Sequence, residues 1–118
     1  MRALVLLVEE DRHTCRTICD MLEALGYRAF GVNSFGRAVR VMSGIGFDAL
    51  IIPAQSPASH EPSHAATAKT MQPNIKVILV SPVSLPQDLS ASVDALIVKP
   101  FLVGSLGDAL IAVLQKLH

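Results

Sequence analysis

Residues 3–8, with the sequence ALVLLV, are followed directly by Glu9, Glu10 and Asp11. A short, continuous apolar run rich in branched side chains is typical of a strand covered on both faces, as in parallel sheets. The run ends abruptly at three consecutive acids. These residues therefore predict a buried strand with a polar loop at its carboxyl end.

The stretch after this loop predicts an amphipathic helix over residues 12–25, with Gly26 where helices are commonly capped. The positions expected to face inward are Cys15, Ile18, Cys19, Leu22 and Leu25. A second strand is expected over residues 27–32, and Asn33 or Ser34 can cap the helix that follows. The buried stripe expected on that helix is Ala38, Val41, Met42 and Ile45.

The third predicted strand, residues 48–52, is followed by Pro53. Proline has no amide hydrogen, so it would break a central hydrogen-bond ladder anywhere but at a strand end. We therefore expect the strand to stop at Ile52 and the amides from Ala54 to Ser63 to exchange rapidly with solvent.

The remaining chain continues to alternate between the two kinds of element. Helices are expected over residues 62–72, 87–92 and 102–117, and strands over residues 76–80 and 95–98. The inward positions of the last helix are Leu106, Leu110, Val113, Leu114 and Leu117. Five successive βα units imply right-handed crossovers and a doubly wound, five-stranded parallel sheet, an α/β fold. No internal repeat or second domain is visible, so residues 1–118 are expected to form a single domain.

The composition limits the classes of partner and the compartment. Ten basic and ten acidic residues cancel, and Lys and Arg are scattered along the chain, so direct nucleic-acid binding is not expected. No apolar run approaches the roughly 18–20 residues that cross a bilayer, and the amino-terminal residues do not resemble a signal peptide. Cys15 and Cys19 are interpreted as two buried thiols, with a redox pair as the alternative. Free cysteines and a near-neutral pI together favour the cytoplasm.

The predicted topology brings five chemically notable residues to one edge of the sheet. Glu9 and Glu10 follow the first strand, and Pro53, Ser81 and Lys99 lie at the ends of the third, fourth and fifth strands. In open parallel sheets the ligand crevice lies beyond the carboxyl ends of the strands. We therefore expect these residues to converge on one crevice.

At these positions the sequence resembles the receiver domain of bacterial two-component response regulators, over nearly its whole length. The resemblance rests on residues 8–11 (VEED), residues 47–52 (FDALII), Ser81 and residues 98–101 (VKPF), the last of which is the most specific. It implies a flavodoxin-like receiver fold and a role in phosphorelay signal transduction.

In that family an aspartate at the end of the third strand accepts a phosphoryl group. The acidic pair holds a magnesium ion, and the lysine and the hydroxyl grip the phosphoryl oxygens. Here Pro53 stands at the acceptor position, and proline has neither a nucleophilic atom nor an oxygen ligand for the cation. Asp48 does not replace it, because it lies five residues earlier, roughly 15 Å away at about 3.3 Å per residue.

Other residues also differ from the family pattern, and these differences likewise argue against the usual phosphotransfer site. Glu9 and Glu10 replace the usual aspartates, and Leu96 stands where many relatives carry a rotating aromatic side chain. The chain between Ser81 and Lys99 is also shorter than in the family. The family's output surface therefore cannot be carried over to this chain.

The retained residues also have simpler interpretations. Lys99 is expected to pair with Glu9 or Glu10, and Ser81 to satisfy a nearby backbone group. No functional metal site is expected, although Glu9 and Glu10 would hold a divalent cation such as Mg²⁺ weakly.

Residues 60–64, HEPSH, match the zinc-protease signature H-E-x-x-H. That signature needs two histidines one turn apart on a regular helix, whereas Pro62 is better placed to begin a helix than to lie within one. We therefore interpret His60 and His64 as part of an exposed polar region rather than as a zinc site.

The resulting hypothesis is a degenerate, or pseudo-, receiver that is not an enzyme and acts through protein contact without phosphorylation. Its expected partner is a histidine kinase, another regulator or a second copy of the chain. One alternative is a receiver that is still modified by phosphotransfer at a non-standard residue. The other is a small-ligand or metal sensor that uses the crevice at the strand ends.

Overall fold

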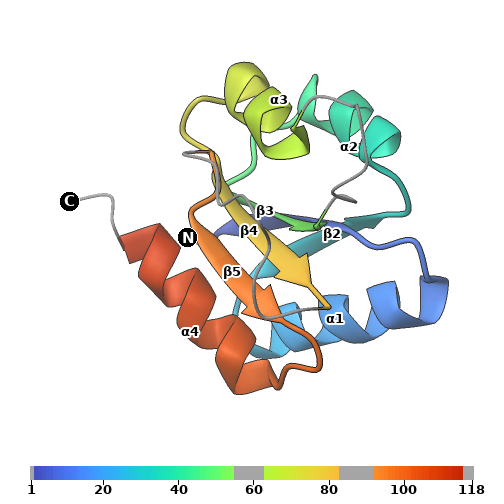
Figure 1. The fold of residues 1–118 in the computed structure, drawn as a ribbon, viewed down its shortest axis with the longest axis vertical. Coiled ribbons are helices and arrows are strands. Elements are labelled where there is room, and N and C mark those ends of the chain that lie inside the picture. The colour runs from blue at the N-terminus through green and yellow to red at the C-terminus, as the bar shows by residue number, and fades with distance from the viewer. Residues whose placement is uncertain (1, 55–62, 83–91, 116–118) are drawn as a thin grey trace.

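The computed structural model of the chain describes residues 2–54, 63–82 and 92–115. Its centre is a parallel five-stranded sheet with the strand order β2-β1-β3-β4-β5 (Figure 1). The strands are β1 (Leu4–Val8), β2 (Arg28–Val32), β3 (Ala49–Pro53), β4 (Lys76–Ser81) and β5 (Ala95–Val98). The helices are α1 (Arg12–Ala24), α2 (Phe35–Met42), α3 (His64–Met71) and α4 (Val103–Leu114). The predicted doubly wound sheet is confirmed, whereas the short helix expected over 87–92 falls, apart from Ser92, outside the described residues.

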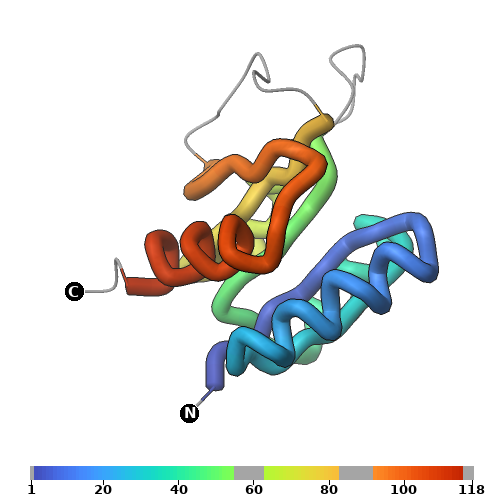
Figure 2. Tube along the Cα trace, turned by 90° about the horizontal axis from the view of Figure 1, so that it is seen from below, coloured from blue at the N-terminus to red at the C-terminus, as the bar shows by residue number. Residues whose placement is uncertain are grey.

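The helices cover the sheet on both faces, α1 and α4 on one and α2 and α3 on the other (Figures 1 and 2). Successive side chains of a strand point to opposite faces, so Leu6 packs beneath α2 and α3 while Leu7 packs beneath α1 and α4. The three central strands are almost fully buried, which explains their unbroken apolar sequences.

Local signals in the sequence set the helix boundaries. Asp11 caps α1 and accepts a hydrogen bond from the amide of Thr14 at 2.8 Å, and Ser34, rather than Asn33, caps α2. Ser63 caps α3, so that helix begins one residue after the cap. Gly26, with φ of 95°, ends the turn after α1 in a conformation that strongly favours glycine.

The third strand ends one residue later than predicted, at Pro53 rather than at Ile52. Pro53 is the last residue of β3, paired in register with Val80, and the amide of Ala54 donates to the carbonyl of Val80 at 2.8 Å. Because backbone groups of alternate residues point to opposite neighbours, the nitrogen of Pro53 faces β1, beyond the last registered pair, Leu7 with Ile51. The missing donor therefore falls at the end of the β1–β3 ladder and leaves the β3–β4 ladder intact. Because its amide is bonded to Val80, Ala54 is expected to exchange slowly rather than rapidly. The rest of that loop before Ser63 lies outside the described residues.

Three expectations about burial also need correction. Ile45 is 42% exposed, because α2 ends at Met42 and its regular stripe does not reach that far. Cys15 and Cys19 are half-buried rather than buried, and both are free thiols. Leu117 of the predicted last helix lies outside the described residues, while Leu114 is half-buried.

Among the helices of the described residues, none combines the length and the apolar character needed to span a membrane.

Candidate functional site at the carboxyl ends of the strands

The structure places the predicted site residues at one edge of the sheet. Because the strands are parallel, the carboxyl ends of β1, β3, β4 and β5 meet at the same edge. Glu9 and Glu10 follow β1, Pro53 and Ser81 are the last residues of β3 and β4, and Lys99 follows β5. The amide of Lys99 donates to the carbonyl of Ser81 at 2.8 Å, which ties the ends of two neighbouring strands together.

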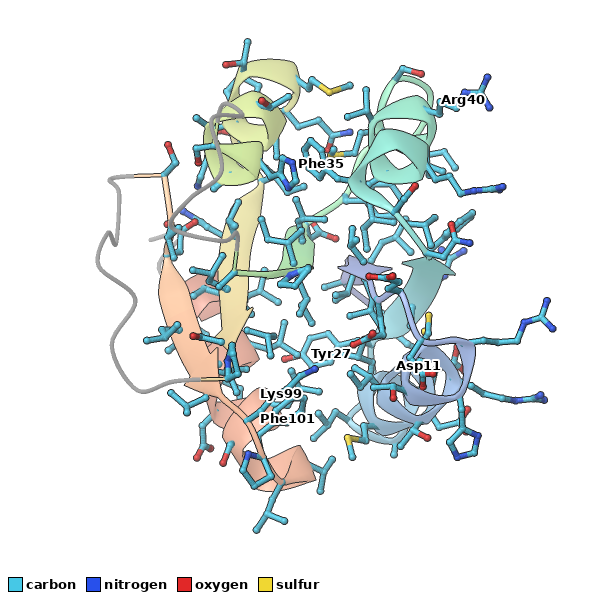
Figure 3. All side chains as sticks on the ribbon, turned by 45° about the vertical axis from the view of Figure 1, so that its right-hand side comes forward. Asp11, Tyr27, Phe35, Arg40, Lys99 and Phe101 are labelled. Carbon is cyan, nitrogen blue, oxygen red and sulfur yellow. The ribbon has the colours of Figure 1, made fainter. Side chains whose placement is uncertain are left out.

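Glu9 is the most engaged of these side chains. Its Oε1 lies 3.6 Å from Nζ of Lys99, and its Oε2 accepts a hydrogen bond from the amide of Asp11 at 2.9 Å. The Glu9 side chain is 16% exposed and that of Lys99 45% exposed, so solvent screens the ion pair and limits it to about 0–1 kcal/mol. In Figure 3 the Lys99 side chain extends from the end of β5 towards β1 and α1. The predicted pairing of Lys99 with one of the two glutamates is thus present.

Asp11 contributes to this arrangement in a way that sequence reasoning missed. Its side chain accepts hydrogen bonds from both the amide and the hydroxyl of Thr14, at 2.8 and 2.6 Å. Its own amide donates a hydrogen bond to the Glu9 side chain. The hydroxyl bond from Thr14 is the main cause that lowers the pKa of the Asp11 carboxyl. A carboxylate one residue before a helix, with a threonine three positions later, is the signal that would have identified it.

Pro53 and Ser81 present little reactive chemistry to solvent at this edge. The Pro53 ring is exposed and carries no polar atom, whereas Ser81 is only 1% exposed. Leu96 is half-buried and packs against the core beneath α2 and α3.

The residues at this edge do not fit a magnesium ion well. Mg²⁺ favours octahedral oxygen coordination, but Pro53 supplies no side-chain oxygen and Glu9 already faces an amide and an ammonium group. Within residues 2–54, 63–82 and 92–115, no group of three or more His, Cys, Asp or Glu side chains could hold a metal ion. Glu10, which is exposed, is the remaining carboxylate next to Glu9.

Two other candidates from the sequence lie away from this edge. The Oδ2 atom of Asp48 accepts from the amide of Leu4 at 2.8 Å, at the amino-terminal end of the sheet, so Asp48 is no substitute acceptor. His64 is the first residue of α3, and its ring stacks on that of Phe35 with centroids 4.0 Å apart. The helix therefore begins two residues later than the expected start at Pro62, and His64 is half-buried rather than part of an exposed polar region. His60 and Glu61 lie outside the described residues.

The half-buried thiols lie on α1, beside β2. Burial is the main cause that raises the pKa of Cys19 to about 11, and the neighbouring Cys15 adds to it. A thiol that stays protonated at neutral pH is a poor nucleophile and a poor metal ligand. The pair therefore shows the properties of packing residues rather than of a reactive dithiol.

Several solved structures have the same fold as this chain. A CheY-like response regulator receiver domain protein from Methanospirillum hungatei JF-1 superposes with a TM-score of 0.86 at 20% identity, covering 98% of this chain and 96% of that one. A CheY-like receiver domain from Methylobacillus flagellatus gives 0.76 at 27% identity, covering 96% and 99%. The response regulator TrrA from Thermotoga maritima, in complex with Mg²⁺ and BeF, gives 0.79 at 20% identity, covering 96% and 99%.

No family model matches the sequence, and the search of curated proteins also found no match. The structural likenesses nevertheless confirm the predicted flavodoxin-like receiver fold over nearly the whole chain.

Proposed function

We propose that this chain is a degenerate (pseudo-)receiver domain of two-component signal transduction that acts through protein–protein contact without being phosphorylated. The proposal treats residues 1–118 as a single domain, located in the cytoplasm and without enzymatic activity. Its support is the combination of a receiver fold with a residue at the end of β3, Pro53, that carries no nucleophilic atom.

The observation that carries the proposal is the residue at the end of β3. In the family that the sequence resembles, an aspartate at this position accepts the phosphoryl group, whereas here an exposed proline ring occupies it. Proline carries no atom that can attack phosphorus. The lysine that would grip a phosphoryl oxygen faces Glu9 instead, at 3.6 Å.

A receiver fold that cannot be phosphorylated still offers the surfaces through which such domains meet other proteins. The proposed partner is therefore a protein, namely a histidine kinase, another regulator or a second copy of the chain, and neither nucleic acid nor membrane. No cofactor is required by the proposal, since the donor set at Glu9 and Glu10 is poor for Mg²⁺.

The test compares phosphoryl labelling of the wild-type chain with that of Pro53→Asp and Pro53→Asn. A small-molecule phosphodonor with Mg²⁺ should leave the wild type and Pro53→Asn unlabelled, because neither side chain is a nucleophile at this site. Pro53→Asp restores the carboxylate and should gain acid-labile, hydroxylamine-sensitive label. Pro53→Asn is the matched control, since it also removes the proline ring and adds a polar side chain of the same size.

Labelling of the wild type would instead support phosphotransfer at a non-standard residue, and mass spectrometry would locate that residue. A parallel NMR titration with Mg²⁺ and beryllofluoride should leave the amides of Glu10, Ala54, Ser81 and Lys99 unshifted. Saturable shifts there in the wild type would favour the ligand-sensor alternative.

A further inference from the structure

The outer edge of β2 is open in the described part of the chain. β2 is the first strand of the sheet and pairs only with β1 among the described strands. The amide of Arg28 donates to Ala3 and the carbonyl of Val32 accepts from Glu9, so these alternate residues face β1. The backbone groups of Ala29 and Gly31 between them therefore point outward, as a row of donors and acceptors to which another strand can bind.

Arginines from two helices surround this edge. A pocket of about 630 Å³ lies beside residues 30–32 of this strand, and its lining includes Arg12 and Arg16 from α1 and Arg37 and Arg40 from α2. All four are exposed, and none forms an ion pair with another residue in the described ranges. Figure 3 shows Arg40 projecting from α2 into solvent. The prediction that basic residues are scattered holds only along the sequence, because the fold gathers them.

The pocket lining is partly apolar and contains more arginines than acids. Phe30 on β2 is 40% exposed, and Val41 and the two half-buried thiols also line the pocket. Glu9 and Glu10 are the acids in the lining, and Glu9 is already engaged by Lys99 and Asp11. The surface as a whole thus combines an unpaired strand edge, a partly apolar lining and an excess of positive charge.

We propose that this surface, the β2 edge with Arg12, Arg16, Arg37 and Arg40, is a docking site for an extended acidic segment of a partner protein. The segment adds to the sheet as a sixth strand, hydrogen-bonded to Ala29 and Gly31, and places its carboxylates beside the arginines. Main-chain hydrogen bonds supply affinity, and the charges supply selectivity and a fast association rate.

The observations favour this occupant over two others. A second copy of the chain would bring the same arginines against these, and like charges across an interface cost several kcal/mol. A nucleic-acid backbone would leave the strand edge unused, because its phosphates cannot continue the hydrogen-bond ladder of β2. An acidic strand satisfies both the charges and the backbone groups.

This inference names a class of partner for the protein-binding role proposed above. It rests on that proposal in one respect, namely that the chain acts by binding another protein. The two can fail separately, because phosphoryl labelling tests the strand-end site and the following experiment tests the β2 edge.

The experiment measures binding of a fluorescent peptide of alternating glutamate and valine, long enough to span β2, to the complete chain. We expect saturable binding with shifts and slowed exchange at the amides of Ala29 and Gly31. Arg16→Glu and Arg37→Glu, one on each flanking helix, should each weaken binding about tenfold. Arg2→Glu is the matched control, since it makes the same charge change at an exposed arginine that does not line the pocket and should bind like the wild type.

Changes in the peptide test the same idea without altering the protein. A peptide that is N-methylated at alternate residues, or one with glutamine for glutamate, should bind at least about tenfold more weakly. Equal binding of the methylated peptide would reduce the contact to charge attraction and overturn strand docking. Absence of binding, or tighter binding of a single-stranded oligothymidylate, would overturn the acidic-segment proposal outright.

Discussion

At the scale of single residues, Gly31 decides how closely α1 packs on β2. A Cβ atom at this position would lie 2.5 Å from Sγ of Cys15 and 3.1 Å from Sγ of Cys19, distances at which something must shift. The two thiols can be half-buried beside the strand because glycine leaves them room.

We therefore expect Gly31→Ala to lower the free energy of unfolding by about 1–2 kcal/mol, through overpacking against the two sulfur atoms. Chemical denaturation followed by circular dichroism measures the change. Adding Cys15→Ala should recover part of the loss, because it removes the closer sulfur. Gly44→Ala is the matched control, since nothing lies within 4 Å of a Cβ there; equal stability of Gly31→Ala and Gly44→Ala would refute the contact.

At the scale of elements, α1 depends on the hydrogen bonds made by its cap. The Asp11 side chain accepts two hydrogen bonds from Thr14, and these bonds lower the pKa of its carboxyl from the ordinary value of an aspartate. A carboxyl whose pKa is lower in the folded chain than in the unfolded chain stabilises the fold above the unfolded pKa. That stabilisation is lost as the pH falls through the folded pKa.

Replacement of the cap should reproduce this dependence on pH. Asp11→Ala is expected to unfold at a lower temperature than the wild type at neutral pH, with the difference shrinking as the pH is lowered into the range where Asp11 titrates. Thermal melts at several pH values measure it. Asp20→Ala, at another exposed acid of the same helix, serves as the control, and a pH-independent difference for Asp11→Ala would contradict the role of the ionised cap.

At the scale of the whole molecule, the sheet has a buried centre and, among the described residues, an open edge at β2. β1, β3 and β4 are covered on both faces by helices, while β2 exposes its backbone along the outer side. Hydrogen exchange should follow this division, because protection depends on backbone hydrogen bonds and on burial.

Amide exchange followed by NMR should show protection at Ala54, whose amide donates to Val80, and rapid exchange at Ala29 and Gly31. Val32 lies in the same edge strand with its amide directed to β1, so its slower exchange is the internal control. Rapid exchange at Ala54 would show that the third strand ends at Ile52, as the sequence alone predicted.

Much of the strand-end site could be predicted from the sequence because each residue follows a recognisable strand. Once Glu9, Pro53, Ser81 and Lys99 are placed after apolar runs in a parallel sheet, their convergence is a consequence of topology. The sequence could not predict which glutamate forms the ion pair with Lys99. The choice depends on the path of the loop after β1, where the amide of Asp11 donates a hydrogen bond to the Glu9 side chain.

The alternation of strands and helices, the buried centre of the sheet and the cap at Gly26 could be predicted from the sequence alone, whereas the sequence left the cap of the second helix open between Asn33 and Ser34. These features arise from the periodicity of apolar side chains and from the preferences of single residues, both of which act over a few positions of the chain.

Only the tertiary structure decided which distant residues share a surface. It kept Pro53 within β3, since the direction of one missing amide depends on the register with β1. It gathered Arg16 and Arg37 from two helices beside one strand edge, although they lie far apart in a chain whose charges cancel. The physical reason is that the neighbours of each strand and helix are chosen by contacts between elements that lie far apart in the sequence.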